Sequence, residues 1–373
     1  YTRIMNPTTA VLEQRLAAME NGLAGLALSS GQAATTYSLL TIAEAGDNFI
    51  TTSTLYGGTY NLFAHTFPQI GIDARFAAPD DIDGMAALID DRTKAIYCES
   101  LGNPAGNIVD IEAIAEMAHA KGVPLIVDNT VPSPYLCKPF DWGADIVVHS
   151  LTKYLGGHGT IIGGAIVDSG TFDWVANKER FRRLNEPDVS YHGVVYTEAL
   201  GEAAYIGRAR VVPLRNMGAA IAPMTSFLAL QGIETLPLRM DRMCDNALAV
   251  AEHLQGHDQV EWVRYAALPD SPHKALADKY LGGRASAILS FGIKGGLEAG
   301  TKFIDALKLI TRLVNIGDAK SLACHPATTT HRQLSEAELA TAGVTEDMVR
   351  LSIGIEHIDD IVADISQALD AAA

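Results

Sequence analysis

Short apolar runs alternate with longer periodic segments through the first half of the chain. Runs of strand length end at polar or glycine-rich turns, as at Gly25–Leu28, Asn48–Thr52 and Ala95–Cys98. The segments between them repeat apolar residues every three or four positions, which is typical of amphipathic helices. Strands that alternate with helices predict a largely parallel sheet covered on both faces. Functional side chains are then expected at the carboxyl ends of the strands, as at Glu99.

The same pattern places the other elements of this half. Further strands are expected at Ala74–Ala77, Pro124–Val127, Asp145–Val148 and Gly163–Val167, and helices after Thr8 or Thr9, after Ser29–Ala34 up to Gly46, from Tyr60, from Met85 and over Ile111–Lys121. A cluster of charges interrupts the pattern between Trp174 and Gly207, which predicts a structured excursion from the core.

The pattern changes toward the carboxyl end. A long apolar helical stretch is expected from about Ile221 to Leu254, with the charges of Arg239–Arg242 on a solvated or interface face. The elements expected after it are strands at Ala285–Phe291 and Arg350–Gly354 and helices at Ala299–Val314 and Ile358–Leu369. We therefore expect an arm over residues 1–10, a large domain over 11–255 and a smaller α+β domain over 256–373.

Composition and charge exclude several classes of protein. A chain of 373 residues with 48% hydrophobic and 19% charged residues is an ordinary globular protein, long enough for two domains. Its formal net charge of −16 argues against binding to nucleic acid or to an anionic membrane, although a local basic site can still hold an anion. No apolar segment is long enough to span a bilayer, and no signal peptide is visible. The chain begins at Tyr1 rather than Met, so we expect a leading segment before it.

Cysteine usage indicates a reducing compartment. The four cysteines lie far apart and form no CxxC or zinc-ligand spacing; they are Cys98, Cys137, Cys244 and Cys324. Reduced thiols in a cytoplasmic protein, with no metal site, are the expectation.

One lysine stands out at the end of an apolar run. The run Asp145–Val148 continues through polar residues to Lys153, which is followed by Gly156 and Gly157. A lysine at the end of a core strand is costly to bury as a cation, so its pKa should be depressed, and a neutral amine is a nucleophile and a base. We interpret Lys153 as the residue that forms a Schiff base with the aldehyde of pyridoxal phosphate. The alternative is a surface lysine where a strand meets a loop.

Pyridoxal phosphate also needs a carboxylate near its pyridine nitrogen and donors for its phosphate. Asp128 ends an apolar strand and suits the first role, whereas its alternative is a helix cap. The turn Ser29–Ala34 leads from a strand into a helix, an arrangement that binds anions, although an ordinary turn has the same composition. Ser150 and Thr152 alternate with Lys153 and are expected to donate to the phosphate together with Gly31 and Gln32.

Two further residues suit an amino-acid substrate. Tyr56 lies in a glycine-flanked loop and is placed to stack on the cofactor ring, unless it is a packed surface tyrosine. Arg350 leads a late strand and is the candidate to grip a substrate carboxylate, unless it forms a structural ion pair.

Six motifs then carry a resemblance that covers essentially the whole chain. They are Tyr1–Thr8, Ser29–Ala34, Leu55–Tyr60, Val127–Thr130, Ser150–Tyr154 and Gly317–Leu322, in this order. The chain resembles the Cys/Met-metabolism family of pyridoxal-phosphate enzymes, which includes cystathionine γ-synthase, cystathionine lyases, methionine γ-lyase and homoserine-ester sulfhydrylases. The resemblance implies the aspartate-aminotransferase-like α/β fold (fold type I) and a homotetramer built from tight dimers.

The motifs also imply roles for single residues. Lys153 resembles the lysine that holds the cofactor, Asp128 the partner of the pyridine nitrogen and Tyr56 the ring-stacking tyrosine. The residues that resemble phosphate ligands are Gly31, Gln32, Ser150 and Thr152, joined by Tyr1 and Arg3, which reach the phosphate of the neighbouring subunit. The residues that resemble the substrate-carboxylate site are Asn103, Ser321 and Arg350.

Within the family, two segments are similar to O-acetylhomoserine sulfhydrylases, namely Asn185–Gly193 and Glu99–Pro104. The resemblance implies a cytoplasmic transferase of methionine biosynthesis that replaces the acetate of O-acetyl-L-homoserine by sulfide or methanethiol. Its products are homocysteine or methionine. Lys153 is expected to move the Cα and Cβ protons, and Tyr56 is expected to assist proton transfer as well as to stack on the ring. Family members carry a further segment before the position of Tyr1, and its absence would compromise substrate access and dimer packing.

Other functions stay open at this point. A γ-lyase or an O-succinylhomoserine sulfhydrylase has the same fold, although Gly58 stands where methionine γ-lyases usually carry a cysteine. A nucleotide-binding oxidoreductase is compatible with the sheet, but Ser29–Ala34 lacks GxGxxG. A non-catalytic cofactor-binding or scaffold protein is excluded only if Lys153, Asp128 and Arg350 meet in one pocket.

Overall fold

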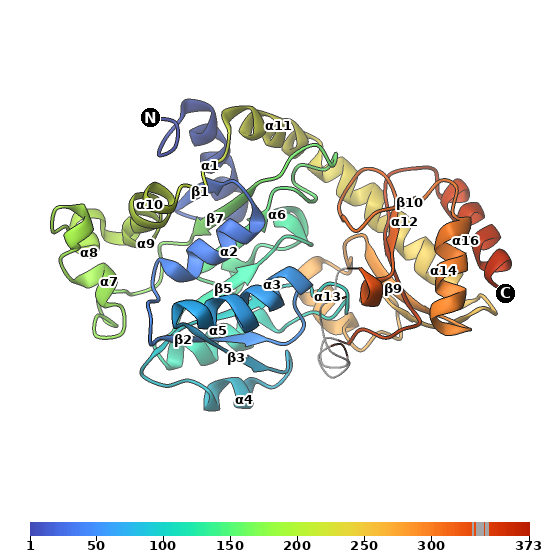
Figure 1. Cartoon of the computed structure of the whole chain (residues 1–373), viewed down its shortest axis with the longest axis horizontal. Coiled ribbons are helices and arrows are strands. Elements are labelled where there is room, and N and C mark those ends of the chain that lie inside the picture. The colour runs from blue at the N-terminus through green and yellow to red at the C-terminus, as the bar shows by residue number, and fades with distance from the viewer. Residues whose placement is uncertain (330–331, 333–338, 340–342) are drawn as a thin grey trace.

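The protein has two sheets, each covered by helices, and they form two domains joined by a pair of helices (Figure 1). The computed structural model describes residues 1–373 except 330–331, 333–338 and 340–342. Within this described part, no helix is both long enough and apolar enough to cross a membrane.

The large sheet contains seven strands, in the order β1-β7-β6-β5-β4-β2-β3. Their bounds are β1 Ala24–Leu28, β2 Asn48–Thr52, β3 Asp73–Ala77, β4 Thr93–Glu99, β5 Leu125–Asp128, β6 Ile146–Ser150 and β7 Gly164–Asp168. All neighbours are parallel except for β7, which runs antiparallel to both β1 and β6. The expected largely parallel sheet is therefore confirmed.

Alternate side chains of each strand enter two separate cores. Val127 and Val147 face the core that α1 (Pro7–Glu20) and α5 (Ile111–Ala120) help to form, whereas Ile126 faces the core shared with α2 (Gly31–Leu40). Both faces of the sheet are buried in this way, which explains why its strands are apolar throughout rather than alternating. The shorter helices of this domain are α3 Gly57–Asn61, α4 Ile82–Ala87 and α6 Ser133–Leu136.

The first helix begins earlier than its sequence pattern predicts. Asn6, not Thr8 or Thr9, is the capping residue, because its side chain accepts a hydrogen bond from the Thr8 amide and Pro7 occupies the first turn. Leu12 is fully buried as expected, whereas Val11 is about half exposed. The next helix, α2, ends at Leu40 and does not reach Gly46.

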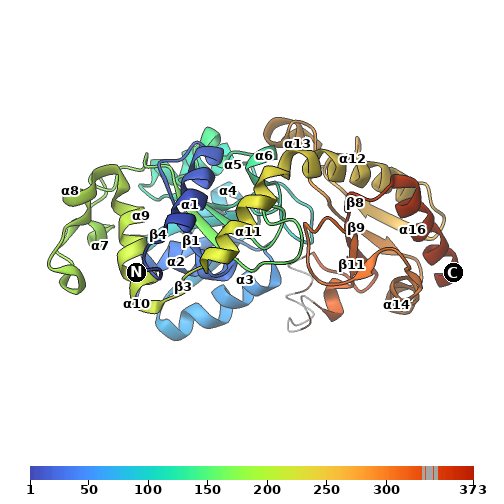
Figure 2. The same cartoon turned by 90° about the horizontal axis from the view of Figure 1, so that it is seen from above.

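The predicted long helical stretch is two helices. It breaks at Thr235 between α11 (Pro223–Glu234) and α12 (Leu236–Gln255), where a proline occupies the first turn of α12. Figure 2 shows α11 over the large domain and α12 over the small one. Because α12 packs against β8, β9 and α16, it lies with the small domain rather than inside the expected unit 11–255. Arg239 is buried, not solvated, and donates to the carbonyls of Tyr154 and Gly232.

The small domain is the expected α+β unit. Its sheet has the order β10-β11-β12-β9-β8, with bounds β8 Val260–Arg264, β9 Ile288–Ile293, β10 Thr311–Arg312, β11 Leu322–Cys324 and β12 Met348–Ser352. Its helices are α13 Lys274–Leu281, α14 Gly296–Ala306 and α16 Ile358–Ala372. The predicted excursion forms the opposite end of the molecule (Figure 1), with α7 Arg182–Asn185, α8 Tyr196–Leu200, α9 Ala204–Ala209 and α10 Arg215–Met217.

The large sheet brings the candidate residues to one edge. β4, β5 and β6 are parallel and in register, so that Glu99 lies beside Asp128, and Asp128 lies beside Val148. Ser150, at the end of β6, pairs with Gly164, and Gly164 also pairs with Leu28 just before the Ser30 turn. Residues from four separate segments therefore meet at the carboxyl edge.

Candidate active site

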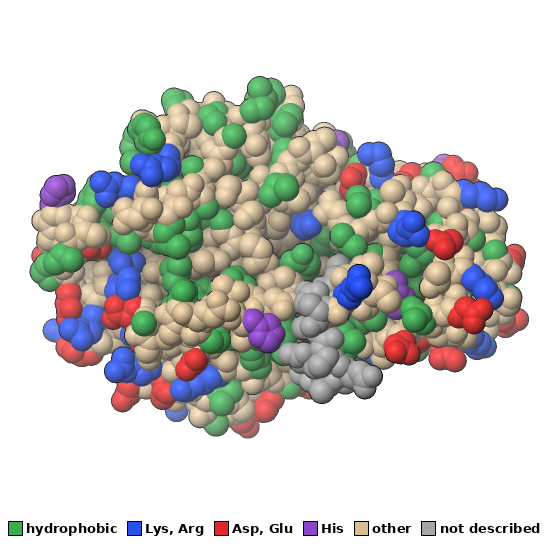
Figure 3. Space-filling view, viewed as in Figure 1, with side chains coloured by type: hydrophobic (Ala, Val, Ile, Leu, Met, Phe, Trp, Pro, Cys, Tyr) green, Lys and Arg blue, Asp and Glu red, His purple; other side chains and the backbone are tan. Residues whose placement is uncertain are grey.

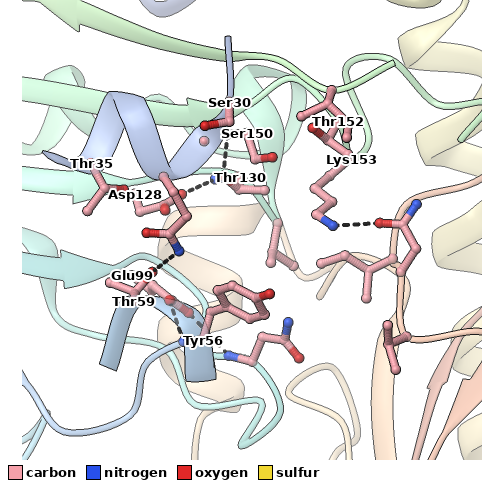
Figure 4. Close-up of a pocket in the computed structure, with 18 of the residues that line it drawn as sticks. Ser30, Thr35, Tyr56, Thr59, Glu99, Asp128, Thr130, Ser150, Thr152 and Lys153 are labelled. Atoms are coloured by element: carbon pink, nitrogen blue, oxygen red, sulfur yellow. Dashed lines mark hydrogen bonds between the residues drawn. The ribbon is translucent and has the colours of Figure 1, made fainter. Parts of the chain in front are cut away.

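A cavity of about 340 Å³ opens between this edge and the small domain (Figure 4). Lys153, Asp128 and Arg350 all line it, which confirms that they converge and contradicts the scaffold alternative. The other sequence-predicted residues on its wall are Gly31, Gln32, Tyr56, Asn103, Ser150 and Thr152.

Lys153 presents an amine with a depressed pKa. It follows β6 and points across the cavity, where its Nζ donates to the Asn315 side-chain oxygen at 2.5 Å (Figure 4). Burial, followed by the positive charge of Arg350, lowers the pKa of Lys153 from 10.5 to about 8. About a tenth of the amine is therefore neutral and nucleophilic at pH 7, whereas a lysine with the ordinary pKa has less than about one part in a thousand in that form. This environment is not that of a surface lysine.

Asp128 is a partly buried carboxylate on the cavity wall, and it caps no helix. Its two oxygens accept hydrogen bonds from the Thr130 amide at 3.0 Å and from the Tyr97 hydroxyl at 3.2 Å. Burial raises the pKa of Asp128, because the charged form loses solvent. A cationic ring nitrogen placed beside it would offset that loss, so Asp128 fits the pyridine nitrogen of pyridoxal phosphate.

The first turn of α2 forms a cradle for an anion. Ser30 caps this helix, and a side chain at Gly31 would begin 2.7 Å from the Ser150 Cβ atom, so the backbone approaches closely only because residue 31 is glycine. Helix amides together with the hydroxyls of Ser150 and Thr152 suit a phosphate. The fit to the cofactor's phosphate is therefore good.

Tyr56 lies at the mouth of the cavity. It precedes α3, its ring points into the cavity (Figure 4), and 41% of the residue stays exposed. The ring is therefore free to lie against a planar ligand, which a tyrosine packed into the surface is not.

Arg350 is a buried cation without a counter-charge. It is 2% exposed and donates to the Asn103 side-chain oxygen at 3.1 Å and to the Val314 carbonyl at 2.8 Å. Its Nε has no partner and no carboxylate pairs with it among the described residues, so the structural ion pair is not found. A buried guanidinium in this state favours an incoming carboxylate.

The structure does not bring three predicted residues to the cavity. Ser321 is buried elsewhere, where its hydroxyl donates to Glu356 and accepts from the Gly354 amide, so it supports the chain behind the site rather than its wall. Tyr1 and Arg3 lie on the surface, where the guanidinium carbon of Arg3 lies 5.3 Å from the centre of the Tyr1 ring. Their predicted contact with a neighbouring subunit stays a prediction.

Sequence reasoning gave no site role to four residues that the fold brings in. Asn315 holds the Lys153 amine, and Thr130 and Tyr97 hold Asp128. Glu99 was expected at a strand end, and its carboxylate proves to accept from the amides of two loops. Glu99 had a usable signal as a carboxylate at a strand end, and Thr130 lies only two positions after Asp128. The partners of Asn315 and Tyr97 are distant in sequence.

Comparisons with known proteins agree with this geometry. Homocysteine synthase of Schizosaccharomyces pombe is 53% identical over 373 residues, which cover 100% of this chain and 87% of that protein. O-acetyl-L-homoserine sulfhydrylase 1 of Thermus thermophilus is 51% identical, over 99% of this chain and 88% of the relative. A crystal structure from Campylobacter jejuni, described as an O-acetylhomoserine (thiol)-lyase with N'-pyridoxyl-lysine-5'-monophosphate, superposes with a TM-score of 0.97 at 42% identity. That superposition covers 99% of this chain and 88% of the crystallised one.

The family model described as Cys/Met metabolism PLP-dependent enzyme matches residues 1–370. The match spans both domains and the whole wall of the cavity, so the expected fold and cofactor are confirmed together. The chain belongs to the Cys/Met metabolism family of pyridoxal-phosphate-dependent enzymes.

Proposed function

We propose that the protein replaces the acetate of O-acetyl-L-homoserine by sulfide, which gives L-homocysteine and acetate. The observation that carries this proposal is the meeting, in one cavity, of the Lys153 amine, the Asp128 carboxylate and the uncompensated Arg350 cation. An amino-acid substrate needs all three. The names of the relatives in Schizosaccharomyces pombe and Thermus thermophilus support the choice of substrate.

Each residue has a separate task in this proposal. Bound pyridoxal phosphate supplies a ring that accepts electrons from the substrate, and Asp128 holds its nitrogen while Gly31, Ser150 and Thr152 hold its phosphate. Arg350 and Asn103 orient the substrate carboxylate. The neutral amine of Lys153 takes the proton from Cα, gives it up, and is then free to take a proton from Cβ. Acetate leaves from Cγ with the bonding electron pair, hydrosulfide adds at Cγ, and protons return to Cβ and Cα, so that the net change is the exchange of acetate for sulfide.

The test separates replacement from elimination. Purified protein is given O-acetylhomoserine with sulfide, or methionine alone, and homocysteine and 2-oxobutyrate are both quantified. Homocysteine from the first mixture supports the proposal, whereas 2-oxobutyrate from methionine supports a γ-lyase. O-succinyl and O-phospho esters, and methanethiol in place of sulfide, define the leaving group and the nucleophile. Full activity in Lys153→Ala contradicts the proposal.

We further propose a cytoplasmic homotetramer built from dimers. Apolar side chains are exposed on the arm, α1 and α11, where hydrophobic atoms gather on the surface (Figure 3); they include Met5, Val11, Met224 and Phe227. Patches of this kind favour association of protein chains. Tyr1 and Arg3 lie on the same arm, which supports their contact with the phosphate site of a second copy.

A further inference from the structure

Glu99 ties together two loops that carry different parts of the site. It ends β4, is only 6% exposed, and its two oxygens accept hydrogen bonds from two backbone amides. One oxygen accepts from Tyr56 at 2.7 Å, and the other accepts from Asn103 at 3.3 Å (Figure 4). Both oxygens are thus engaged by the protein itself.

The two loops serve the cofactor and the substrate respectively. Tyr56 presents its ring to the cavity, and Asn103 accepts the hydrogen bond from Arg350 Nη1. A continuous path of contacts therefore runs from the ring of Tyr56 through Glu99 and Asn103 to the guanidinium of Arg350. No other carboxylate within the described residues bonds to both of these loops.

A charged group is expensive to keep at this position. Glu99 lies beside Asp128 across the strand pair, and burial and the neighbouring carboxylate both raise the pKa of Glu99. A glutamine of the same shape avoids that repulsion. However, its amide group has only one oxygen acceptor, so it satisfies one backbone amide and opposes the other. The geometry therefore gives a specific reason for a carboxylate.

We propose that Glu99 is a positioning residue that couples the cofactor-stacking loop of Tyr56 to the carboxylate-binding loop of Asn103. Loss of one hydrogen bond releases one loop directly, and the side chain that is then held on one side only can shift and loosen its hold on the other loop. Binding of the cofactor ring and binding of the substrate carboxylate should weaken together. The inference rests on the proposed function only for the site of carboxylate binding, since any α-amino acid is a suitable probe.

The test compares Glu99→Gln with the unchanged holoenzyme. The dissociation constant of pyridoxal phosphate is measured on the apoprotein, and that of L-norvaline from the absorbance change of the bound cofactor. L-norvaline has no leaving group at Cγ, so its binding is read even if the γ-replacement proposal fails. Both constants should rise about tenfold, the effect of one lost hydrogen bond to a charged group. The KM for O-acetylhomoserine should rise similarly, and the KM for sulfide should not.

The chain offers a matched control in Asp168. It is 2% exposed and also accepts from the amides of two segments, Gly170 at 3.0 Å and Ile206 at 3.3 Å, but at the opposite edge of the sheet. Asp168→Asn should lower the melting temperature without changing either dissociation constant. The same result in Glu99→Gln would overturn the proposal. If Glu99→Gln does not fold, Glu99→Asp is used; its shorter side chain reaches only one loop, so unchanged constants there overturn the proposal equally.

Discussion

At the scale of single residues, Arg350 differs from other buried arginines because its Nε lacks a hydrogen bond and no carboxylate pairs with it among the described residues. The Nε of Arg208 also lacks a hydrogen bond, but it lies 3.9 Å from the carboxylate of Asp188. Arg239 is buried, but its Nε, Nη1 and Nη2 atoms all donate to the protein. Arg350 is buried as deeply, and yet its Nε has no partner in the part of the chain that the structure describes. A buried donor without a partner is unfavourable, so Arg350 is poised for a ligand, whereas Arg239 is not.

The depressed pKa of Lys153 predicts how the apoprotein takes up its cofactor. Only the neutral amine attacks the aldehyde, so the rate of uptake should rise with pH and level off above about 8 rather than above 10.5. Stopped-flow absorbance across the alkaline range measures this rate. A rate that still climbs steeply near the ordinary lysine pKa would contradict the prediction.

A variant of the partner side chain checks the cause of this shift. Asn315→Asp places a carboxylate within hydrogen-bond distance of the Lys153 amine, which should move the rate profile to higher pH.

The depressed pKa of Lys153 also determines how the free energy of unfolding changes with pH. Between about 8 and 10.5 the unfolded chain binds more protons at Lys153 than the folded one, so its contribution to stability increases with pH across that window.

At the scale of elements, the turn between β1 and α2 depends on close backbone approach. An ideal Cβ atom at Gly164 would lie 2.0 Å from the Ser30 carbonyl oxygen, and one at Gly31 would lie 2.7 Å from the Ser150 Cβ atom. Gly31 and Gly164 therefore let the start of α2 approach β6 and β7 closely, and this approach places the first turn of α2 at the cavity. The phosphate cradle is a property of this junction rather than of any one side chain.

We predict that Gly31→Ala weakens cofactor binding. The added methyl group pushes α2 away from Ser150, so the dissociation constant of pyridoxal phosphate should increase at least about tenfold, as overpacking distorts the donors. Fluorescence titration of the apoprotein measures it. Gly256→Ala is the matched control, because its nearest atom lies 3.7 Å away and it caps α12 outside the cavity. Equal affinities in both variants would show that the cradle tolerates a side chain.

At the scale of the whole molecule, the cavity is formed between domains. The large domain supplies Asp128 and Lys153, and the small domain supplies Arg350 and Asn315. The arm with Tyr1 and Arg3 contributes nothing to the cavity of its own chain. An arm that completes the site of a second copy makes the oligomer part of the catalytic unit.

Complementation between two inactive variants tests this arrangement. Arg3→Ala and Lys153→Ala are mixed as unfolded or dissociated chains and reassembled. If Arg3 acts in the neighbouring subunit, a mixed dimer contains one intact site and one doubly altered site, so random reassembly restores about a quarter of wild-type activity. Each variant reassembled alone is the control. If Arg3 acts within its own chain, the mixture shows no gain over the two separate variants.

Much of the architecture follows from local sequence. The strand at Asn48–Thr52 and the start of the helix at Ile111 match the prediction, because period and turn residues depend on neighbours along the chain. Lys153 and Asp128 were recognisable for a related reason, since a charged group at the end of a buried strand demands a ligand. The order of the motifs then indicated the family.

Contacts between distant segments were not accessible in the same way. The Lys153–Asn315 hydrogen bond joins residues 162 positions apart, and the Arg350–Asn103 bond joins residues 247 positions apart. Local periodicity contains no information about contacts over such sequence separations, because these contacts depend on how the two domains pack together. The family resemblance implies that Ser321 belongs to the substrate-carboxylate site, whereas the fold turns its hydroxyl toward Glu356. The sequence by itself therefore identified which residues carry the chemistry. Their hydrogen-bond partners were decided only by the tertiary structure, because residues of both domains line the same cavity.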